Sequence, residues 1–369
     1  MTRLQRLSSE FGQSPWLDNL RRSYIADGTL KALVARGVRG LTSNPTIFQK
    51  AIQGSVEYDD QFSRLSADGL SIEQIYWEMV LSDIRGALDI FEPVYRSSHG
   101  VDGYVSVEVD PMLANDMDGT LSAARDLRAR IAQSNVMIKV PATLEGLPAI
   151  RQLTAEGVSV NVTLIFSLER YSAVIEAFLN GLEERAATTN ADLSDVASVG
   201  SFFISRVDSE VDSRLVTIGS DRAQALTGKA AVAQARLAYE LFGERFSGPR
   251  WEALASRGAR PQRPLWASTS TKNPAYPDTM YVDELIGPQS VNTLPDPTLE
   301  AFDHHGTLSR TVDMRLDEAH KVWNELHDTG IDMSDVAAKL ERDGVASFQS
   351  SFRELLTALA EKAANTTGS

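Results

Sequence analysis

Residues 135–143 read NVMIKVPAT, a short apolar run with one lysine in its second half. Alternation along a strand places the β-branched residues on one face and Met137 with Lys139 on the other. Pro141 is expected to end the strand, so Lys139 lies near its carboxyl end. Burial disfavours the ammonium form of an amine, and a neutral amine can attack a ketone to form a Schiff base. A lysine at this place can also be an edge-strand residue that only discourages aggregation. The residues around it must distinguish between these two roles.

The composition is that of a chain that can bury a sizeable core. It has 369 residues, 43% of them hydrophobic, a size that a barrel of alternating strands and helices reaches as one domain. No run approaches the roughly 20 apolar residues of a membrane span, and the first residues lack the apolar core of a signal peptide. The absence of cysteine suits a reducing compartment. We therefore expect a cytoplasmic protein.

The charges limit the partners. A formal net charge of −14 argues against nucleic acid or an anionic membrane, and an anionic substrate would need a local basic pocket. None of the five histidines has the spacing of metal ligands, and no glycine-rich phosphate loop is present. The sequence therefore predicts neither a metal site nor a nucleotide cofactor.

Eight short strand-like runs alternate with helical patterns, which predicts right-handed crossovers and a parallel sheet. We expect a single α/β domain over residues 1–369, a closed (β/α)8 TIM barrel with extra helices and its active site at the carboxyl strand ends. Residues 299–369 are expected to form a helical tail packed on the barrel. The runs are residues 14–17, 38–42, 104–109, 136–140, 158–163, 197–203, 264–269 and 290–293.

Two helical regions fall outside this alternation. The second connection, residues 45–103, is long enough for two or three helices, with residues 72–91 the strongest. In the tail an apolar stripe recurs at helical spacing, which favours core packing against the barrel or a partner. The stripe consists of Phe348, Phe352, Leu355 and Leu359.

Three consecutive strands carry a polar face. In YVSVEVDP and VSVNVTLIF, valines alternate with polar residues that include Glu108, Asn161 and Thr163. Helices cover the outside of a parallel barrel, so the valines should face outward and the polar residues, with Lys139, inward. Buried polar groups need partners or a ligand. A structural ion pair between Glu108 and Lys139 is one interpretation, and a catalytic pocket is the one we favour.

At this point the chain resembles a known family, the transaldolases of the longer bacterial type within the class I Schiff-base aldolases. Several motifs in the same order carry the resemblance, from residue 16 to about residue 298, and the helical tail also resembles that subgroup. The matching segments are WLDNLRR (16–22), LTSNPTIF (41–48), VSVEVDP (105–111), NVMIKVPAT (135–143), VSVNVTLIFSLERY (158–171), SFFISRVDSEVD (201–212), RPLWASTSTKNPAYPDTMYVDELIGP (263–288) and VNTLPDPT (291–298).

The resemblance implies transfer of a dihydroxyacetone unit from sedoheptulose 7-phosphate or fructose 6-phosphate to glyceraldehyde 3-phosphate or erythrose 4-phosphate, in the non-oxidative pentose phosphate pathway. It implies that Lys139 is the nucleophile and that Glu108 moves protons through a water held by Thr163. Asp18 would take the proton of the C4 hydroxyl. From the sequence alone, Asp18 fits the N-cap of a helix equally well. No cofactor is implied, because the imine itself accepts the electrons.

The resemblance also implies which residues hold the three-carbon fragment. Asn44, Asn161 and Ser201 would hydrogen-bond it, and Phe203 would form a wall of the pocket. Asn44 precedes a proline and fits turn chemistry as well, and an isolated aromatic such as Phe203 also fits the core.

For the phosphate, the matching residues are Arg206, Ser270 and Lys272. Lys272 stands where shorter relatives use arginine, which keeps the charge but loses the bidentate fork. The longer subgroup often has glycine at the position of Ser270, so Ser268 or Thr269 is an alternative phosphate ligand.

Two other functions compete with a transferase. A fructose-6-phosphate aldolase-like lyase would use the same imine but release the three-carbon fragment. A silent barrel would only bind sugar phosphates, and would be expected to lack the lysine or the carboxylates. Lys139, Glu108 and Asp18 are all present.

Overall fold

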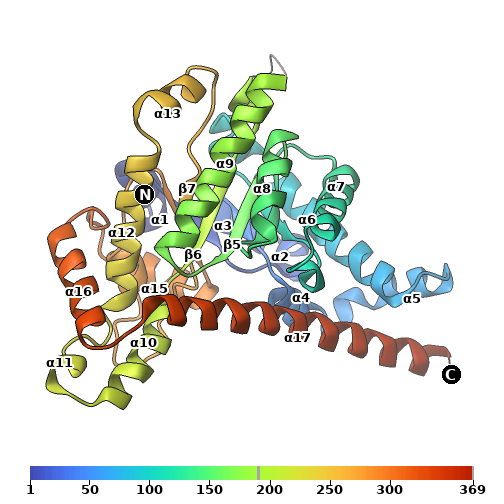
Figure 1. The fold of residues 1–369 in the computed structure, drawn as a ribbon. Coiled ribbons are helices and arrows are strands. Elements are labelled where there is room, and N and C mark those ends of the chain that lie inside the picture. Colours follow the sequence, from blue (N-terminus) through green and yellow to red (C-terminus); the bar gives the residue numbers. More distant parts are fainter. Residues whose placement is uncertain (189–191, 368–369) are drawn as a thin grey trace.

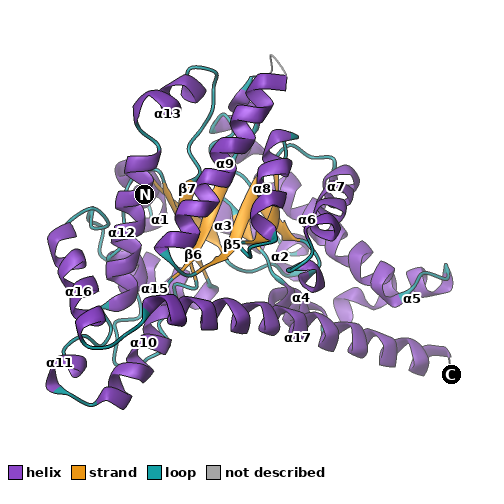
Figure 2. Cartoon of the chain, viewed as in Figure 1, coloured by secondary structure: helices purple, strands orange, loops and turns teal. Residues whose placement is uncertain are grey.

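The computed structural model describes residues 1–188 and 192–367, and in them eight parallel strands close into a barrel. Each strand pairs with the next along the chain, and β8 pairs with β1. Figure 2 shows the strands at the centre of the molecule with helices around them. This confirms the predicted (β/α)8 barrel. The strands are β1 (Gln13–Leu17), β2 (Leu41–Thr42), β3 (Val105–Glu108), β4 (Val136–Pro141), β5 (Val160–Ile165), β6 (Ser198–Phe203), β7 (Arg263–Ala267) and β8 (Ser290–Leu294).

Helices surround the barrel and follow or precede its strands (Figure 1). Those of the described residues are α1 (Arg3–Phe11), α2 (Arg22–Ala26), α3 (Thr29–Arg36), α4 (Pro45–Ile52), η1 (Val56–Tyr58), α5 (Asp59–Ala67), α6 (Ile72–Ser97), η2 (Pro111–Leu113), α7 (Met117–Ile131), α8 (Gly146–Ala155), α9 (Leu168–Thr188), η3 (Leu193–Asp195), α10 (Ser205–Ile218), α11 (Asp221–Gln224), α12 (Ala230–Arg245), α13 (Gly248–Ala255), α14 (Met280–Asp283), α15 (Asp296–His305), α16 (Leu316–Asp328) and α17 (Met333–Thr367).

The strand bounds differ from the sequence prediction by three residues at the start of β2 and by one or two residues in each of the other strands. Of the second expected run, residues 38–42, only Leu41–Thr42 form a regular strand. The seventh expected run continued to residue 269, but β7 ends at Ala267. The next residue, Ser268, has φ of 56°, a left-handed conformation that a strand does not accommodate.

The long second connection contains α4, α5 and α6, as its length predicted. Asn44 caps α4, since its Oδ1 accepts a hydrogen bond from the backbone N–H of Ile47 at 2.9 Å, and Pro45 occupies the first helical position. The strongest expected helix is α6, which starts with a capping box formed by Ser71 and Gln74.

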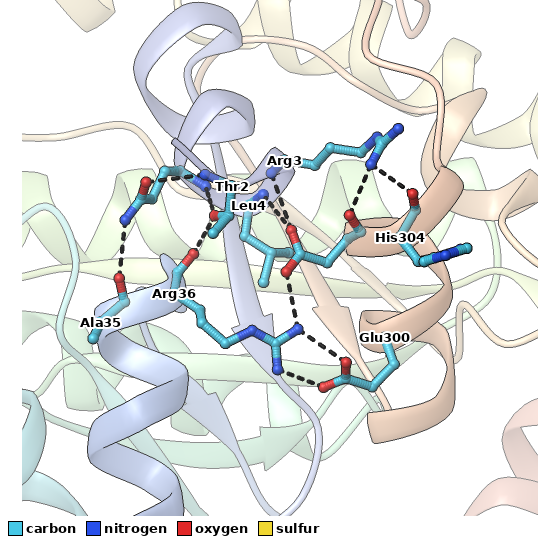
Figure 3. Close-up of polar contacts among 9 residues, drawn as sticks. Thr2, Arg3, Leu4, Ala35, Arg36, Glu300 and His304 are labelled. Atoms are coloured by element: carbon cyan, nitrogen blue, oxygen red, sulfur yellow. Dashed lines mark hydrogen bonds and ion pairs between the residues drawn. The ribbon is translucent and has the colours of Figure 1, made fainter.

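Polar contacts fix the N-terminal helix α1 at the amino-terminal end of the barrel (Figure 3). Asp303 Oδ1 of α15 accepts a hydrogen bond from the backbone N–H of Arg3 at 3.0 Å, and the Arg3 guanidinium donates to the carbonyl oxygens of Asp303 and His304. Arg36 of α3 pairs with Glu300 at 2.6 Å and with Asp303 at 2.9 Å. Three helices that are distant in sequence are thereby joined at the end opposite the carboxyl strand ends.

The long helix α17 runs across the barrel from α10 towards α4 and α5 (Figure 1). Its apolar stripe is buried, as expected, and includes Phe348 and Phe352. The Phe352 ring packs edge-on against Tyr76 of α6, with 5.1 Å between the ring centres. Helix α17 therefore lies over the carboxyl ends of the strands, where the site is expected.

Candidate active site

A cavity of about 340 Å³ opens at the carboxyl ends of the strands. Eight of the eleven residues predicted for the site line it, and they come from segments far apart along the chain. Glu108, Asn161 and Thr163 do not line the open cavity but are buried among the inner faces of β3 and β5. The eight lining residues are Asp18, Asn44, Lys139, Ser201, Phe203, Arg206, Ser270 and Lys272.

Lys139 lies at the base of this cavity and is almost completely buried, with 4% of its surface exposed. Its Nζ is 3.5 Å from Glu108 Oε2 on the neighbouring strand β3 and donates a hydrogen bond to the backbone oxygen of Ser43 at 3.1 Å. The ring of Phe348, from α17, lies 5.9 Å from the same nitrogen. The amine is therefore held away from bulk water with a carboxylate beside it.

The register of the barrel explains this contact. Glu108, Lys139 and Asn161 occupy matched positions on β3, β4 and β5. Since side chains alternate along each strand, matched residues point to the same side of the sheet. The predicted convergence of these polar side chains inside the barrel is confirmed.

Burial raises the pKa of Glu108 from its ordinary value to about 7, an effect that Lys139 partly offsets. Apart from the ion pair with Lys139, Glu108 Oε2 makes no hydrogen bond to a residue of the described ranges. At neutral pH such a carboxyl group exists in both protonation states, which suits it to both accept and donate a proton.

Thr163 has a buried hydroxyl that also makes no hydrogen bond within the described ranges. It lies in an irregular part of β5, where the register with β6 shifts between Val162 and Ile165 and Leu164 has φ of 60°. A bulge of this kind changes the direction of a side chain and is common beside active sites. The hydroxyl is thus free to bind a water or ligand.

Asp18 follows β1 and is not a helix cap, so that alternative is wrong: the N-cap of α2 is Arg21. Thr42 Oγ1 donates a hydrogen bond to Asp18 Oδ1 at 2.7 Å. Because that donation uses the proton of Thr42, the 2.6 Å contact between the hydroxyls of Thr42 and Thr293 must be donated by Thr293. Burial raises the pKa of Asp18, and the nearby charge of Lys139 lowers it in part. A carboxylate in this setting is a candidate general base.

A chain of hydrogen bonds orients the amide of Asn161. Its Nδ2 donates to Ser106 Oγ at 3.0 Å, and its Oδ1 accepts from Ser201 Oγ at 2.7 Å. Asn44 uses its Oδ1 for the helix cap, and its Nδ2 makes no hydrogen bond to the described residues. Asn44 therefore stabilises the turn before α4, which was one of the two roles the sequence suggested, and it also lines the cavity.

Cations occupy one side of the cavity. The Arg206 guanidinium lies 5.1 Å from the centre of the Phe203 ring and makes no hydrogen bond or ion pair with the part of the chain that the structure describes. Lys272 Nζ donates to Ser270 Oγ at 2.7 Å. Burial lowers the pKa of Lys272, and the positive charges of Arg206 and Lys50 lower it further. The Asp18 carboxylate offsets this effect only in part, and like charges gathered in this way are unfavourable, so this side of the cavity is suited to an anion.

The three candidate hydroxyls for an anion differ in their positions. Thr269 is fully buried and donates to the backbone oxygen of Thr293 at 3.0 Å. Ser268 and Ser270 both line the cavity, and the Ser268 hydroxyl lies 3.0 Å from that of Ser205. Ser268 and Ser270 therefore remain candidate phosphate ligands, whereas the Thr269 hydroxyl already donates its hydrogen bond within the fold.

Lys50, Ser347 and Phe348 are among the cavity-lining residues that the sequence did not assign to the site. A signal for Lys50 was available: Asn44, Ile47 and Lys50 recur every three residues at one side of α4, and all three line the cavity. No local signal indicated which part of α17 would reach the cavity.

In the described residues, no group of three or more histidine, cysteine, aspartate or glutamate side chains is placed to hold a metal ion. The described helices also include none with the length and apolarity needed to cross a bilayer.

A parallel eight-stranded barrel, with a buried lysine and two carboxylates at its carboxyl strand ends, places the chain in the class of (β/α)8-barrel enzymes. Residues 15–359 match the model of the Transaldolase/Fructose-6-phosphate aldolase family. The chain is 52% identical over 356 residues to a transaldolase of Parafrankia sp. (strain EAN1pec), with 96% of each chain covered. It is 51% identical over 363 residues to a transaldolase of Thermobifida fusca (strain YX), with 98% of each covered. The chain therefore belongs to the Transaldolase/Fructose-6-phosphate aldolase family and is an enzyme of the transferase class.

Proposed function

We propose that this chain transfers a dihydroxyacetone unit from sedoheptulose 7-phosphate to glyceraldehyde 3-phosphate, giving erythrose 4-phosphate and fructose 6-phosphate. The observation that carries the proposal is the buried Lys139 amine, 3.5 Å from Glu108, at the base of a cavity that Asp18 and several cations also line. A cytoplasmic location in the pentose phosphate pathway is part of the same proposal.

The first step forms the imine. The neutral Nζ of Lys139 attacks the ketone carbon of the donor sugar, and the resulting carbinolamine loses its hydroxyl as water. Glu108 supplies the proton for that water, through a water molecule held by Thr163. The pKa of Glu108, raised by burial to about 7, supports this role because the group can give and regain a proton near neutral pH.

The second step breaks the carbon–carbon bond. Asp18 takes the proton of the C4 hydroxyl, the bond between C3 and C4 breaks, and its electron pair moves into the protonated imine to give an enamine. The phosphorylated aldehyde leaves. A second aldehyde then accepts the enamine carbon, and the same steps in reverse release the new ketose and restore Lys139.

Binding residues divide between the two ends of the substrate. Asn44, Asn161 and Ser201 hold the dihydroxyacetone fragment by hydrogen bonds, with Phe203 as a wall. Charge-assisted hydrogen bonds from cations hold phosphate oxygens well, which supports a phosphate site at the cationic side of the cavity. That site consists of Arg206, Ser270 and Lys272 in this proposal.

The competing function is a lyase that releases free dihydroxyacetone. The position of Phe348 favours the transferase, because α17 places an apolar ring 5.9 Å from the reactive nitrogen, where it limits access of water to the enamine.

The test incubates the purified protein, after exhaustive chelation, with fructose 6-phosphate and erythrose 4-phosphate. We expect sedoheptulose 7-phosphate to accumulate with little free dihydroxyacetone. Free dihydroxyacetone formed as fast as sedoheptulose 7-phosphate would favour the lyase function. Activity lost on chelation and restored by zinc or magnesium would contradict the imine mechanism.

A further inference from the structure

The loop between β7 and α14, residues 268–279, carries two of the residues proposed to bind phosphate, Ser270 and Lys272. These two bond to each other, with Lys272 Nζ 2.7 Å from Ser270 Oγ. That bond joins neighbours on one loop, so it does not set their distance from Arg206, which lies on α10. At the start of the loop, the backbone oxygen of Ser268 accepts a hydrogen bond from Ser205 beside Arg206 at 3.0 Å, but the part that carries Ser270 and Lys272 needs a further contact to hold it in place.

Tyr276 supplies such a contact. Its hydroxyl donates a hydrogen bond of 2.6 Å to Asp212 Oδ2, in the middle of α10, and the other carboxylate oxygen accepts from the backbone N–H of Gly228 at 2.8 Å. Burial and the Asp212 carboxylate both raise the pKa of Tyr276, so the phenol keeps its proton and acts as the donor.

The ring of Tyr276 fits closely against the chain before α12. Gly228 has φ of 72°, and a Cβ at this position would lie 2.7 Å from Tyr276 Cζ. A side chain there would be strained and would also displace the ring. The ring and the hydroxyl of Tyr276 are therefore fixed from two directions, by Gly228 and by Asp212.

A similar arrangement repeats one helical turn earlier. Asp208 of α10 accepts hydrogen bonds from the Tyr281 hydroxyl and from the backbone N–H of Ala231, both at 2.8 Å. Residues four apart lie on the same face of a helix, so Asp208 and Asp212 present two carboxylates to the segment that follows β7. Of the two tyrosines, Tyr276 is the one in the loop that carries Lys272.

Helix α10 also carries Arg206 in its first turn, six residues before Asp212, which corresponds to about 9 Å along the helix axis. We propose that Asp212 and Tyr276 are positioning residues that set Lys272 and Ser270 at a fixed distance from Arg206, so that one phosphate group is held from both sides. This inference rests on the proposed function and deepens it.

The alternative is that the bond serves only the stability of the fold. The two roles differ in what they change. Loss of a positioning bond weakens the binding of phosphate and of phosphorylated ketoses while the imine chemistry at Lys139 continues. Loss of a bond that only stabilises the fold lowers the melting temperature and leaves the KM unchanged.

The test uses Tyr276→Phe, which removes only the hydroxyl and keeps the ring against Gly228. Tyr239→Phe is the matched control: the Tyr239 hydroxyl, on α12, donates to the backbone oxygen of Pro288 at 2.7 Å and does not line the cavity. Asp212→Asn is a second variant, because an amide can still accept from Gly228 but holds the phenol less strongly.

For each variant we would measure the Kd of inorganic phosphate by calorimetry, kcat and KM with fructose 6-phosphate, activity with unphosphorylated fructose, and the melting temperature. Tyr276→Phe should raise the phosphate Kd and the KM about threefold to tenfold, with kcat and the use of fructose nearly unchanged. Tyr239→Phe should leave all binding values unchanged.

An unchanged phosphate Kd in a folded Tyr276→Phe protein would overturn the inference, as would an equal loss with fructose or in Tyr239→Phe. If the wild-type protein binds phosphate but catalyses no transfer between phosphorylated sugars, the proposed function fails instead. The phosphate Kd still tests the positioning role in that case.

Discussion

Lys139 Nζ and Glu108 Oε2 lie 3.5 Å apart on neighbouring strands inside the barrel, with only 4% and 6% of the two residues exposed. Removing both groups from water costs free energy that their mutual attraction only partly restores. An ion pair in this place is therefore a weak way to stabilise the fold. It is a suitable way to keep an amine and a proton carrier together.

Lys139→Arg should abolish turnover while the protein stays folded, because a guanidinium stays protonated and cannot form an imine. In the wild-type protein, borohydride added with fructose 6-phosphate should trap a reduced adduct on Lys139, located by mass mapping of the peptides. An adduct on Lys50 or Lys272, with Lys139 unmodified, would overturn the assignment.

Glu108→Gln and Asp18→Asn should slow different steps. Glu108→Gln should slow formation and release of the imine, and Asp18→Asn should form the imine but cleave the carbon–carbon bond slowly. Loss of a general acid or base of this kind costs about 10²–10⁴ in rate. Rapid-quench trapping with borohydride measures the two steps separately. Equal slowing of imine formation by both substitutions would contradict the division.

Stability should depend on pH through Glu108. Burial raises its pKa to about 7 from an ordinary value of 4.5, so the folded chain binds the proton more tightly than the unfolded chain does. This contribution to stability is fully present below the unfolded pKa and is lost as the pH rises through the folded pKa.

Urea unfolding from about pH 5 to about pH 8 checks this. The free energy of unfolding of the wild type, relative to that of Glu108→Gln, should fall with rising pH and level off above about pH 7. Some pH dependence should persist in the variant, because burial also raises the pKa of Asp208, to about 6. A constant difference between the two proteins across this range would contradict the prediction.

Phe348→Ala should increase the release of free dihydroxyacetone relative to transfer, because it opens the cavity above Lys139 to water. Phe352→Ala is the matched control: it removes the same ring from α17, but that ring packs on Tyr76 and does not line the cavity. Each change removes a buried aromatic at a cost of about 3–5 kcal/mol in stability. A similar product ratio in both variants would show that the ring of Phe348 has no special role.

Arg206→Ala should raise the KM for fructose 6-phosphate about 10- to 100-fold, since a charge-assisted hydrogen bond contributes about 1.5–3 kcal/mol. Use of unphosphorylated fructose should change far less. Lys50→Gln should raise the same KM by a smaller factor, about twofold to fivefold, because Lys50 is exposed at the rim of the cavity. Lys31→Gln, an exposed lysine of α3, controls for the lost charge. Equal effects on phosphorylated and unphosphorylated substrates would place the phosphate elsewhere.

Patterns within single strands were enough to predict the barrel and the inner position of its reactive groups. Alternation within NVMIKVPAT and VSVNVTLIF separates the polar from the apolar face of each strand. In a parallel barrel covered by helices, the apolar face contacts the helices and the polar face points into the barrel. The sequence therefore predicts that Lys139, Glu108 and Asn161 lie together inside the barrel. This is possible because the two-residue alternation of side chains along a strand is a local property of the chain.

The groups that complete the cavity from distant parts of the chain depend on how the helices and loops pack around the barrel. Phe348 reaches Lys139 across more than 200 residues, and Tyr276 finds Asp212 because α10 and the loop after β7 meet in space. The direction in which the Thr163 side chain points depends on the bulge at Leu164. The Asp18 carboxylate is held by a hydrogen bond from Thr42. These contacts follow from the closure of the barrel and the docking of α17, which no pattern within a single segment encodes.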